Sequence, residues 1–263
     1  MRIEPIFGRR SQMMRFRRAR GGSARSCPAN LIVIDPPTVR KVKDLEPVLY
    51  DACSCREIDP ELPVYTVYRT LWTDEDERST LLKHGLRYDV TDMPPLTLGE
   101  EYVKTFGHEH LPSGGAWSHP ELFEILDGEA CFLIQRYRAE EVVDVSLVVA
   151  REGDVVLVPP SSGHVMINAS SNRLVVGNLI SRYCFQSYRR FIDRKGAAYL
   201  LLNGGRLVRN ENYPSLPEVR IVNAPPVSFV DKESGLLASL GRHPELFSFL
   251  NRQWDAPQYS RSG

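Results

Sequence analysis

Short apolar runs broken by glycine and proline dominate the middle of the chain and predict strands rather than long helices. Residues 122–126 and 131–135 are both apolar-rich, and Asp127-Gly128, a pair typical of tight turns, lies between them. This arrangement predicts a β-hairpin whose first strand begins at Glu121. The central part of the chain is therefore expected to be all-β.

A second apolar run and a leucine-rich C-terminal segment complete the pattern. Residues 155–158 follow Gly153 and stop at Pro159, because proline cannot continue an interior strand. The spacing of leucines over residues 234–250 predicts one or two short helices, interrupted at His243-Pro244. We expect these helices to pack on the exterior of the β-structure or against a second subunit.

The chain is predicted to have three parts. Residues 1–30 contain eight arginines and one acidic residue, with little apolar periodicity, and are interpreted as a flexible basic tail. A solvated run, or a start assigned upstream of the true one, is favoured over an anion-binding arm. Residues 31–225 are expected to form the β-domain, with its core beginning at the apolar residues 31–34. Residues 226–263 form a C-terminal helical extension.

Composition excludes several classes of partner. The formal net charge is zero, so we expect no nucleic-acid partner. No apolar run approaches the roughly 18 residues of a membrane span, so we expect no membrane partner. The five cysteines form no evident disulfide framework, which favours a reducing, cytoplasmic location.

Three histidines and one glutamate are the candidate metal ligands. His108 and His110 are two residues apart, so on a strand both imidazoles lie on the same face. Glu121 opens one predicted strand, and His164 lies where another begins. Three imidazoles and a carboxylate are a ligand set with which a small β-barrel can hold one divalent metal ion and leave positions open.

The spacing of these residues resembles the two motifs of the cupin superfamily, G-x5-H-x-H-x3,4-E-x6-G and G-x5-P-x-G-x2-H-x3-N. The second motif runs from Gly153 through Pro159 and His164 to Asn168, with Ser161 in place of the inner glycine. The resemblance implies an all-β cupin fold, that is, a double-stranded β-helix or jelly-roll barrel, with an N-terminal extension and short C-terminal helices.

The first motif departs further from the pattern. Its leading glycine is displaced, and the segment between His110 and Glu121 is longer than usual. His119 competes with Glu121 for the carboxylate position, but only Glu121 keeps the motif's spacing to Gly128. His119 is therefore interpreted as a solvent-exposed loop residue.

Within the cupins, the chain looks like the cupin-type, or archaeal-type, glucose-6-phosphate isomerases. The similarity is carried by residues 105–110, 120–123 and 159–164 and extends over roughly residues 38–225. It implies metal-dependent interconversion of glucose 6-phosphate and fructose 6-phosphate, an aldose–ketose isomerisation of glycolysis and gluconeogenesis. It also implies a homodimer with a small sugar phosphate as substrate.

The resemblance implies that His108, His110, Glu121 and His164 bind one divalent metal ion per subunit. Fe²⁺ or Mn²⁺ is preferred, since an octahedral ion keeps two adjacent positions free; Zn²⁺, Ni²⁺ and Co²⁺ stay possible. Glu121 is assigned first as a ligand and second as a catalytic base that moves a proton between C2 and C1. A hydride shift, which needs no base, stays open.

Thr91, Thr105 and Gly107 match positions that contact the substrate phosphate in that family. Their alternative interpretation is that of ordinary strand threonines and a close-packed glycine. Lys104 and Arg182 are further possible donors of unknown orientation and are interpreted as solvated surface charges.

Three departures from the family keep other functions open. Phe123 and Ile180 stand where the family has tyrosine, and Gln186 stands where it has histidine; Tyr183 or Tyr188 could substitute for the lost groups. The alternatives are a non-catalytic sugar-phosphate-binding cupin and another metal-dependent enzyme, either a sugar isomerase or epimerase or an oxygenase.

Overall fold

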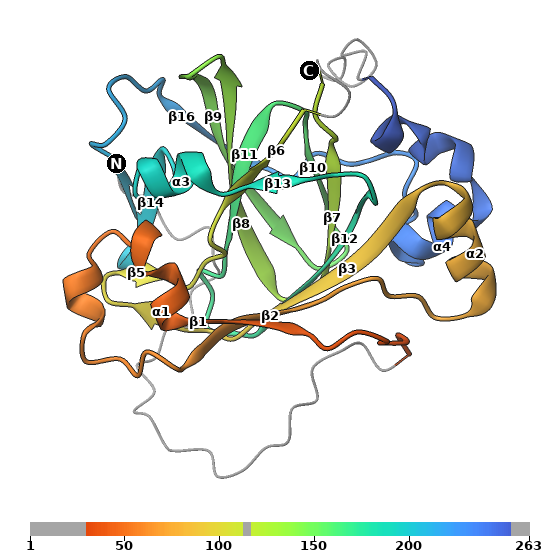
Figure 1. Cartoon of the computed structure of the whole chain (residues 1–263), viewed down its shortest axis with the longest axis horizontal. Helices are drawn as coiled ribbons and strands as arrows, with labels where there is room; N and C mark the ends of the chain where they lie inside the picture. Colours follow the sequence, from red (N-terminus) through yellow and green to blue (C-terminus); the bar gives the residue numbers. More distant parts are fainter. Residues whose placement is uncertain (1–29, 113–116, 254–263) are drawn as a thin grey trace.

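Two six-stranded, mainly antiparallel sheets face each other and form a barrel (Figure 1). The structure is a computed structural model and describes residues 30–112 and 117–253. The first sheet consists, in spatial order, of β1 (Thr38–Lys41), β2 (Pro63–Tyr68), β3 (Leu86–Met93), β12 (Leu174–Ser181), β7 (Glu121–Asp127) and β10 (Val155–Val158). The second consists of β13 (Gln186–Ser187), β6 (His108–His110), β11 (Ser162–Ile167), β8 (Glu129–Arg138), β9 (Glu141–Arg151) and β16 (Val219–Asn223).

A small third sheet and short helices cover the barrel. The third sheet contains β15 (Arg206–Arg209), β14 (Tyr199–Leu202), β5 (Glu101–Tyr102) and β4 (Thr97–Leu98). The α-helices are α1 (Val42–Leu45), α2 (Glu75–Lys83), α3 (Arg189–Asp193) and α4 (Gly235–Arg242). The 3-10 helices are η1 (Glu46–Val48), η2 (Ala52–Cys55), η3 (Asn203–Gly205) and η4 (Pro244–Asn251).

Consecutive strands of the barrel mostly alternate between the two sheets. From β7 to β12 the only neighbours in sequence that pair with each other are β8 and β9. This alternation is the jelly-roll arrangement, so the predicted all-β cupin fold is confirmed. The predicted strand 155–158 is also confirmed, since β10 has these bounds.

The predicted hairpin around Asp127-Gly128 is wrong. β7 pairs with β10 and β12 in the first sheet, whereas β8 pairs with β9 and β11 in the second. Gly128 does turn sharply, with φ +88°. The turn carries the chain from one sheet to the other because β7 and β8 each bury an apolar face against the facing sheet.

β7 is buried on both of its faces. Phe123 packs in the core between the sheets, whereas Leu122 points outward into a second apolar cluster. Two-sided burial explains why apolar residues do not alternate with polar ones over residues 122–126, where Glu124 is the only polar residue.

The second cluster lies between the first sheet and the C-terminal helices. Leu236 and Leu240 of α4 and Phe247 and Leu250 of η4 pack there with outward residues of the sheet. The predicted short helices and their interruption at Pro244 are confirmed. Of the two packing alternatives, the helices cover the exterior of their own barrel, at the right of Figure 1.

Of the predictions for the N-terminal part of the chain, the start of the core is wrong and the others stay predictions. The core does not begin at residues 31–34, because Ile32, Val33 and Ile34 are 40–60% exposed. Among the described residues, the first buried core residue is Val42 of α1. Ile32 forms only an isolated bridge to Trp72, so this apolar run lacks a strand partner along its length. The basic tail lies outside the described residues apart from Asn30, and the boundaries at 30 and 225 stay predictions.

Two further observations concern membrane and redox chemistry. Among the described residues, no helix combines the length and apolarity that a membrane crossing requires. The four cysteines of the described ranges are free thiols.

Lys104 is not the solvated charge expected from the sequence. Its side chain is 5% exposed, and Nζ donates to Glu101 Oε1 at 2.5 Å and to the Val48 carbonyl at 2.8 Å. Glu101 Oε2 in turn accepts from the Tyr50 backbone N–H at 2.6 Å. This buried pair joins the third sheet to the segment around η1.

Replacing Lys104 by methionine is expected to lower the free energy of unfolding by about 3–5 kcal/mol, because Glu101 would stay buried without its cation. Arg206→Met is the matched control, since Arg206 pairs with Glu100 at the surface, and it should cost less than about 1 kcal/mol. Denaturant unfolding of both variants measures the difference. Equal losses would contradict the structural role of the buried pair.

Candidate metal centre

The four predicted ligands meet between the two sheets. His108 and His110 project from β6, His164 from β11 and Glu121 from the start of β7. β6 and β11 are antiparallel neighbours, with His108 directly opposite His164. One ligand atom from each residue lies within 4.8 Å of the others, so this cluster could hold a metal ion.

The polar atoms of the cluster converge on the Glu121 carboxylate. Oε2 lies 3.2 Å from His110 Nε2 and 3.5 Å from His164 Nε2. The ring centroids of His108 and His164 are 4.4 Å apart. Three strands from two sheets thus fix the cluster, and none of its ligands is on a free loop.

Several of these atoms are buried without a hydrogen-bond partner among the described residues. They include His108 Nε2, His110 Nε2 and Glu121 Oε2. Buried polar atoms are normally satisfied, and an unsatisfied group carries a desolvation cost of about 1–3 kcal/mol. A divalent cation would satisfy all three atoms, so the residues present fit a metal ion.

Neighbouring groups orient two of the ligands. The Nδ1 of His110 lies 2.7 Å from the His119 carbonyl oxygen, which can only accept, so Nδ1 carries the proton and Nε2 is left for a metal. The Asn178 amide donates to Glu121 Oε1 at 2.7 Å, which leaves Oε2 as the free carboxylate oxygen.

The pKa values of two of the three histidines, His108 and His164, agree with a ligand role. Burial, with the neighbouring imidazoles, lowers the pKa of His108 and of His164 well below the usual value, which favours the neutral, metal-binding form. Burial also acts to lower the pKa of His110, but the Cys184 and Glu121 side chains outweigh it and raise that pKa to about 10. A proton on His110 and a metal ion would therefore compete for the same carboxylate.

A pocket of about 70 Å³ opens beside His108, Glu121 and His164. Its lining includes all three residues predicted to contact phosphate, Thr91, Thr105 and Gly107. The structure thus brings the predicted metal and phosphate residues to one pocket, although their roles stay predictions.

Backbone conformation and packing are enough to explain why position 107 is a glycine. Its φ is +84°, and a Cβ there would come within 2.6 Å of the Phe191 and Val165 side chains. The close-packed interpretation is therefore correct for this glycine, and it does not exclude a backbone contact to a ligand.

Two arginines of the pocket were missed by the sequence analysis. Arg40 of β1 and Arg69, which follows β2, both line it. Arg69 donates to the Thr38 hydroxyl at 2.8 Å. They are 29 positions apart, and only the pairing of β1 with β2 brings them together, so no local spacing signals them. Arg182, by contrast, is exposed as expected.

The three departures from the family pattern lie in different surroundings. Phe123 and Gln186 line the pocket, whereas Ile180 is fully buried and does not. Of the two candidate substitutes, Tyr188 lines the pocket and donates to Gln186 Oε1 at 3.0 Å. Tyr183 is 63% exposed and is not a lining residue.

His119 is buried, and its predicted exposure is wrong. Its residue is only 3% exposed, its Nδ1 lies 2.8 Å from the Leu250 carbonyl oxygen, and its ring packs edge-on to Trp117. Burial lowers the pKa of His119. The reason for the wrong prediction is that η4 covers this loop, a contact between residues 131 positions apart. The described cluster contains Glu121 and not His119.

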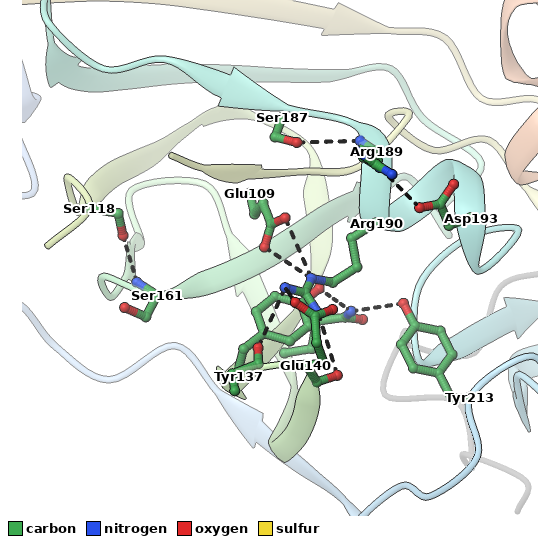
Figure 2. Close-up of polar contacts among 12 residues, drawn as sticks. Glu109, Ser118, Tyr137, Glu140, Ser161, Ser187, Arg189, Arg190, Asp193 and Tyr213 are labelled. Carbon is green, nitrogen blue, oxygen red and sulfur yellow. Dashed lines mark hydrogen bonds and ion pairs between the residues drawn. The ribbon is translucent and has the colours of Figure 1, made fainter. Parts of the chain in front are cut away.

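A second polar network braces β6 from the opposite face (Figure 2). Glu109 lies between the two histidines in sequence, so its side chain projects away from them. The Arg190 guanidinium of α3 binds the Glu109 carboxylate at 3.2 Å and Glu140 at 2.8 Å, and lies 4.2 Å from the Tyr137 ring centroid. β6, which carries His108 and His110, is thus bound by the His119 carbonyl on one face and by Arg190 on the other.

Comparison with known proteins gives one family match. Residues 39–218, more than half of the chain, match the protein-family model described as glucose-6-phosphate isomerase (GPI). No curated protein sequence matches the chain.

Solved structures that resemble part of the chain include an oxalate oxidase, at 16% identity over 46% of this chain and 53% of that chain, with a TM-score of 0.35. Oxalate decarboxylase from Lactobacillus farciminis matches at 14% identity over 46% of this chain and 29% of that chain, with a TM-score of 0.33. Tomato vicilin matches at 15% identity over 46% and 30%, with a TM-score of 0.32. The chain spans about half the length of the first of these proteins and less than a third of the other two.

His164→Ala and His108→Ala are expected to abolish metal retention and leave the barrel folded. A metal that binds only the native state raises the melting temperature by mass action, so added Mn²⁺ or Co²⁺ should stabilise the wild type and not these variants. His243→Ala, at an exposed histidine, is the control and should respond like the wild type. Wild-type metal content in either ligand variant would contradict the assignment.

Proposed function

The chain belongs to the glucose-6-phosphate isomerase family, and from this membership we propose that it interconverts glucose 6-phosphate and fructose 6-phosphate with one divalent metal ion. The observation that carries the proposal is the pocket shared by the candidate ligands and the candidate phosphate residues. An isomerase acting on C1 and C2 of a 6-phosphate needs both kinds of group in one site. We further propose Fe²⁺ or Mn²⁺ as the metal.

The metal end of the pocket suits charge development on the sugar carbonyl. A bound divalent ion would act there as a Lewis acid. His108, His110 and His164 would hold the ion through their imidazoles. Burial disfavours the protonated forms of His108 and His164, whereas at His110 the ion would replace a proton. The low exposure of His110, Glu121 and His164 also excludes bulk water, which strengthens electrostatic stabilisation.

Glu121 is the proposed base. Its Oε1 is fixed by Asn178, and its Oε2 has no hydrogen-bond partner among the described residues. A carboxylate held in this way can accept a proton from C2 of the aldose and return it to C1. If the hydrogen moves as a hydride instead, Glu121 acts as a metal ligand only.

The lining of the same pocket offers donors for a phosphate dianion. Arg40 and Arg69 provide guanidinium groups, which match phosphate geometry. Thr105 Oγ1 accepts from the Met166 backbone N–H at 3.0 Å, which leaves its hydroxyl proton free to donate. Thr91 and the Gly107 N–H complete the proposed set.

Gln186 and Tyr188 are the proposed contacts to the sugar hydroxyls. The Tyr188 proton is used in the hydrogen bond to Gln186 Oε1, so the free donor is the Gln186 amide NH₂. An amide cannot titrate, so this pair can orient a sugar without exchanging protons with it.

Two pocket residues favour a second candidate, a non-catalytic sugar-phosphate-binding cupin. Phe123 and Gln186 both line the pocket and both lack the titratable groups that the family carries there. Binding would then occur without turnover. The homodimeric state, the cytoplasmic location and the role in glycolysis and gluconeogenesis are further proposals that rest on the family alone.

The deciding experiment is turnover of fructose 6-phosphate by the purified chain, coupled to glucose-6-phosphate dehydrogenase. Activity should disappear after chelator treatment and return with Fe²⁺ or Mn²⁺, with Zn²⁺, Ni²⁺ and Co²⁺ tested beside them. Metal and sugar-phosphate binding without turnover under any ion would reject the isomerase and favour the binding protein. Consumption of O₂ with a bound substrate would instead indicate an oxygenase.

Glu121→Gln is expected to lower kcat by about 10²–10⁴-fold at saturating metal, because the amide cannot take up the C2 proton. Metal content measured in the same samples separates this effect from ligand loss. Glu100→Gln, at an exposed ion pair, should keep wild-type kcat. Unchanged turnover in Glu121→Gln would reject the base role and leave Glu121 as a ligand.

A further inference from the structure

The loop that precedes Glu121 connects the C-terminal extension to a candidate metal ligand. His119 uses two different groups for this connection. Its side-chain Nδ1 lies 2.8 Å from the Leu250 carbonyl oxygen of η4, and its own carbonyl oxygen lies 2.7 Å from His110 Nδ1. His110, His119 and Leu250 are all buried.

We propose that His119 is a positioning residue for the metal centre and that the C-terminal extension, through Leu250, fixes the orientation of the His110 imidazole. The proposal rests on the metal-binding part of the proposed function and does not depend on which reaction follows. Nothing in the family match covers the extension, since that match ends at residue 218.

The direction of each hydrogen bond follows from its acceptor. A carbonyl oxygen can only accept, so both His119 and His110 must carry their proton on Nδ1. In His110 this leaves Nε2 as the ring atom that faces the cluster, 3.2 Å from Glu121 Oε2. In neutral His119 the only ring N–H donates to the Leu250 carbonyl oxygen, so this imidazole binds the loop before Glu121 to η4.

The far end of the connection is fixed in its turn. Leu250 is fully buried in the second apolar cluster. The adjacent Asn251 side chain donates to the His84 carbonyl oxygen at 2.7 Å and accepts from the Ser181 hydroxyl at 2.5 Å. The Leu250 carbonyl is therefore held against α2 and β12, and His119 binds to a rigid support.

The residue before His119 makes a parallel contact toward the third histidine. Ser118 Oγ accepts from the Ser161 backbone N–H at 2.7 Å, directly before the strand that carries His164 (Figure 2). Glu121 follows two residues after His119. Residues 118–121 thus contain the ligand Glu121, contact the ligand His110 and bind the backbone three residues before the ligand His164. The bond from His119 to Leu250 ties this segment to η4.

The test compares His119→Ala with His119→Asn in the full-length chain. Asparagine keeps a donor near the position of the histidine Nδ1, so it can restore the bond to Leu250, whereas alanine cannot. The readouts are Co²⁺ affinity by chelator competition and the visible absorption spectrum of the Co²⁺-loaded protein. Loss of an outer partner of a metal ligand weakens metal binding by about 10–100-fold.

We expect His119→Ala to weaken Co²⁺ binding by that factor and to change the spectrum, and His119→Asn to recover both in large part. Leu236→Ala is the matched control, because it opens the same apolar cluster without touching the connection. It should lower the melting temperature and leave Co²⁺ affinity and spectrum as in the wild type.

Three outcomes would overturn the proposal. The first is wild-type affinity and spectrum in His119→Ala, and the second is equal weakening in His119→Ala and His119→Asn. If His119→Ala does not fold, Asn251→Ala replaces it as the test variant, since it removes the hydrogen bonds that support the Leu250 carbonyl at a distance from the metal. Unchanged Co²⁺ affinity in Asn251→Ala is the third outcome that would overturn the proposal.

The result is also distinguishable from failure of the proposed function. If the wild type binds no Co²⁺, the metal centre and this inference fail together. If Co²⁺ affinity follows the variants as expected and no sugar phosphate is turned over, the positioning role is supported and only the isomerase reaction is rejected.

Discussion

The burial of three imidazoles and one carboxylate between two sheets is the constraint on which the rest of the site depends. Such groups are costly to remove from water unless they are paired or bind a cation. The protein meets this cost partly through fixed partners, the His119 carbonyl for His110 and the Asn178 amide for Glu121. The atoms left unpaired face one another, so the same constraint that threatens stability creates affinity for a metal ion.

The candidate ligands could be predicted because their signals are local. A two-residue period on one strand determines the common face of His108 and His110, and the glycine and proline around residues 155–158 determine where the strand before His164 ends. The short C-terminal helices were predictable for the same reason. In each case the residues that determine the structure are close in sequence.

The failed predictions all depend on contacts between distant residues. Asp127-Gly128 favours a turn but does not say whether the next strand pairs or crosses to the other sheet. His119 and Lys104 are polar residues that are buried against distant partners, the Leu250 and Val48 carbonyls, and Arg40 reaches the pocket only after β1 pairs with β2. Propensity and spacing carry no information on such partners.

A single stretch of five residues serves both sides of the strand that carries His108 and His110. Gln186 and Tyr188 line the pocket, whereas Arg190, two positions later, clamps Glu109 on the far side. The length of this stretch is therefore under tighter restriction than its composition. Side chains can be exchanged one at a time, as Gln186 itself illustrates. One inserted or deleted residue, by contrast, would shift Arg190 relative to the pocket residues, so that both could no longer keep their contacts. Divergence in this lineage is thus expected to proceed here by substitution and not by change of length.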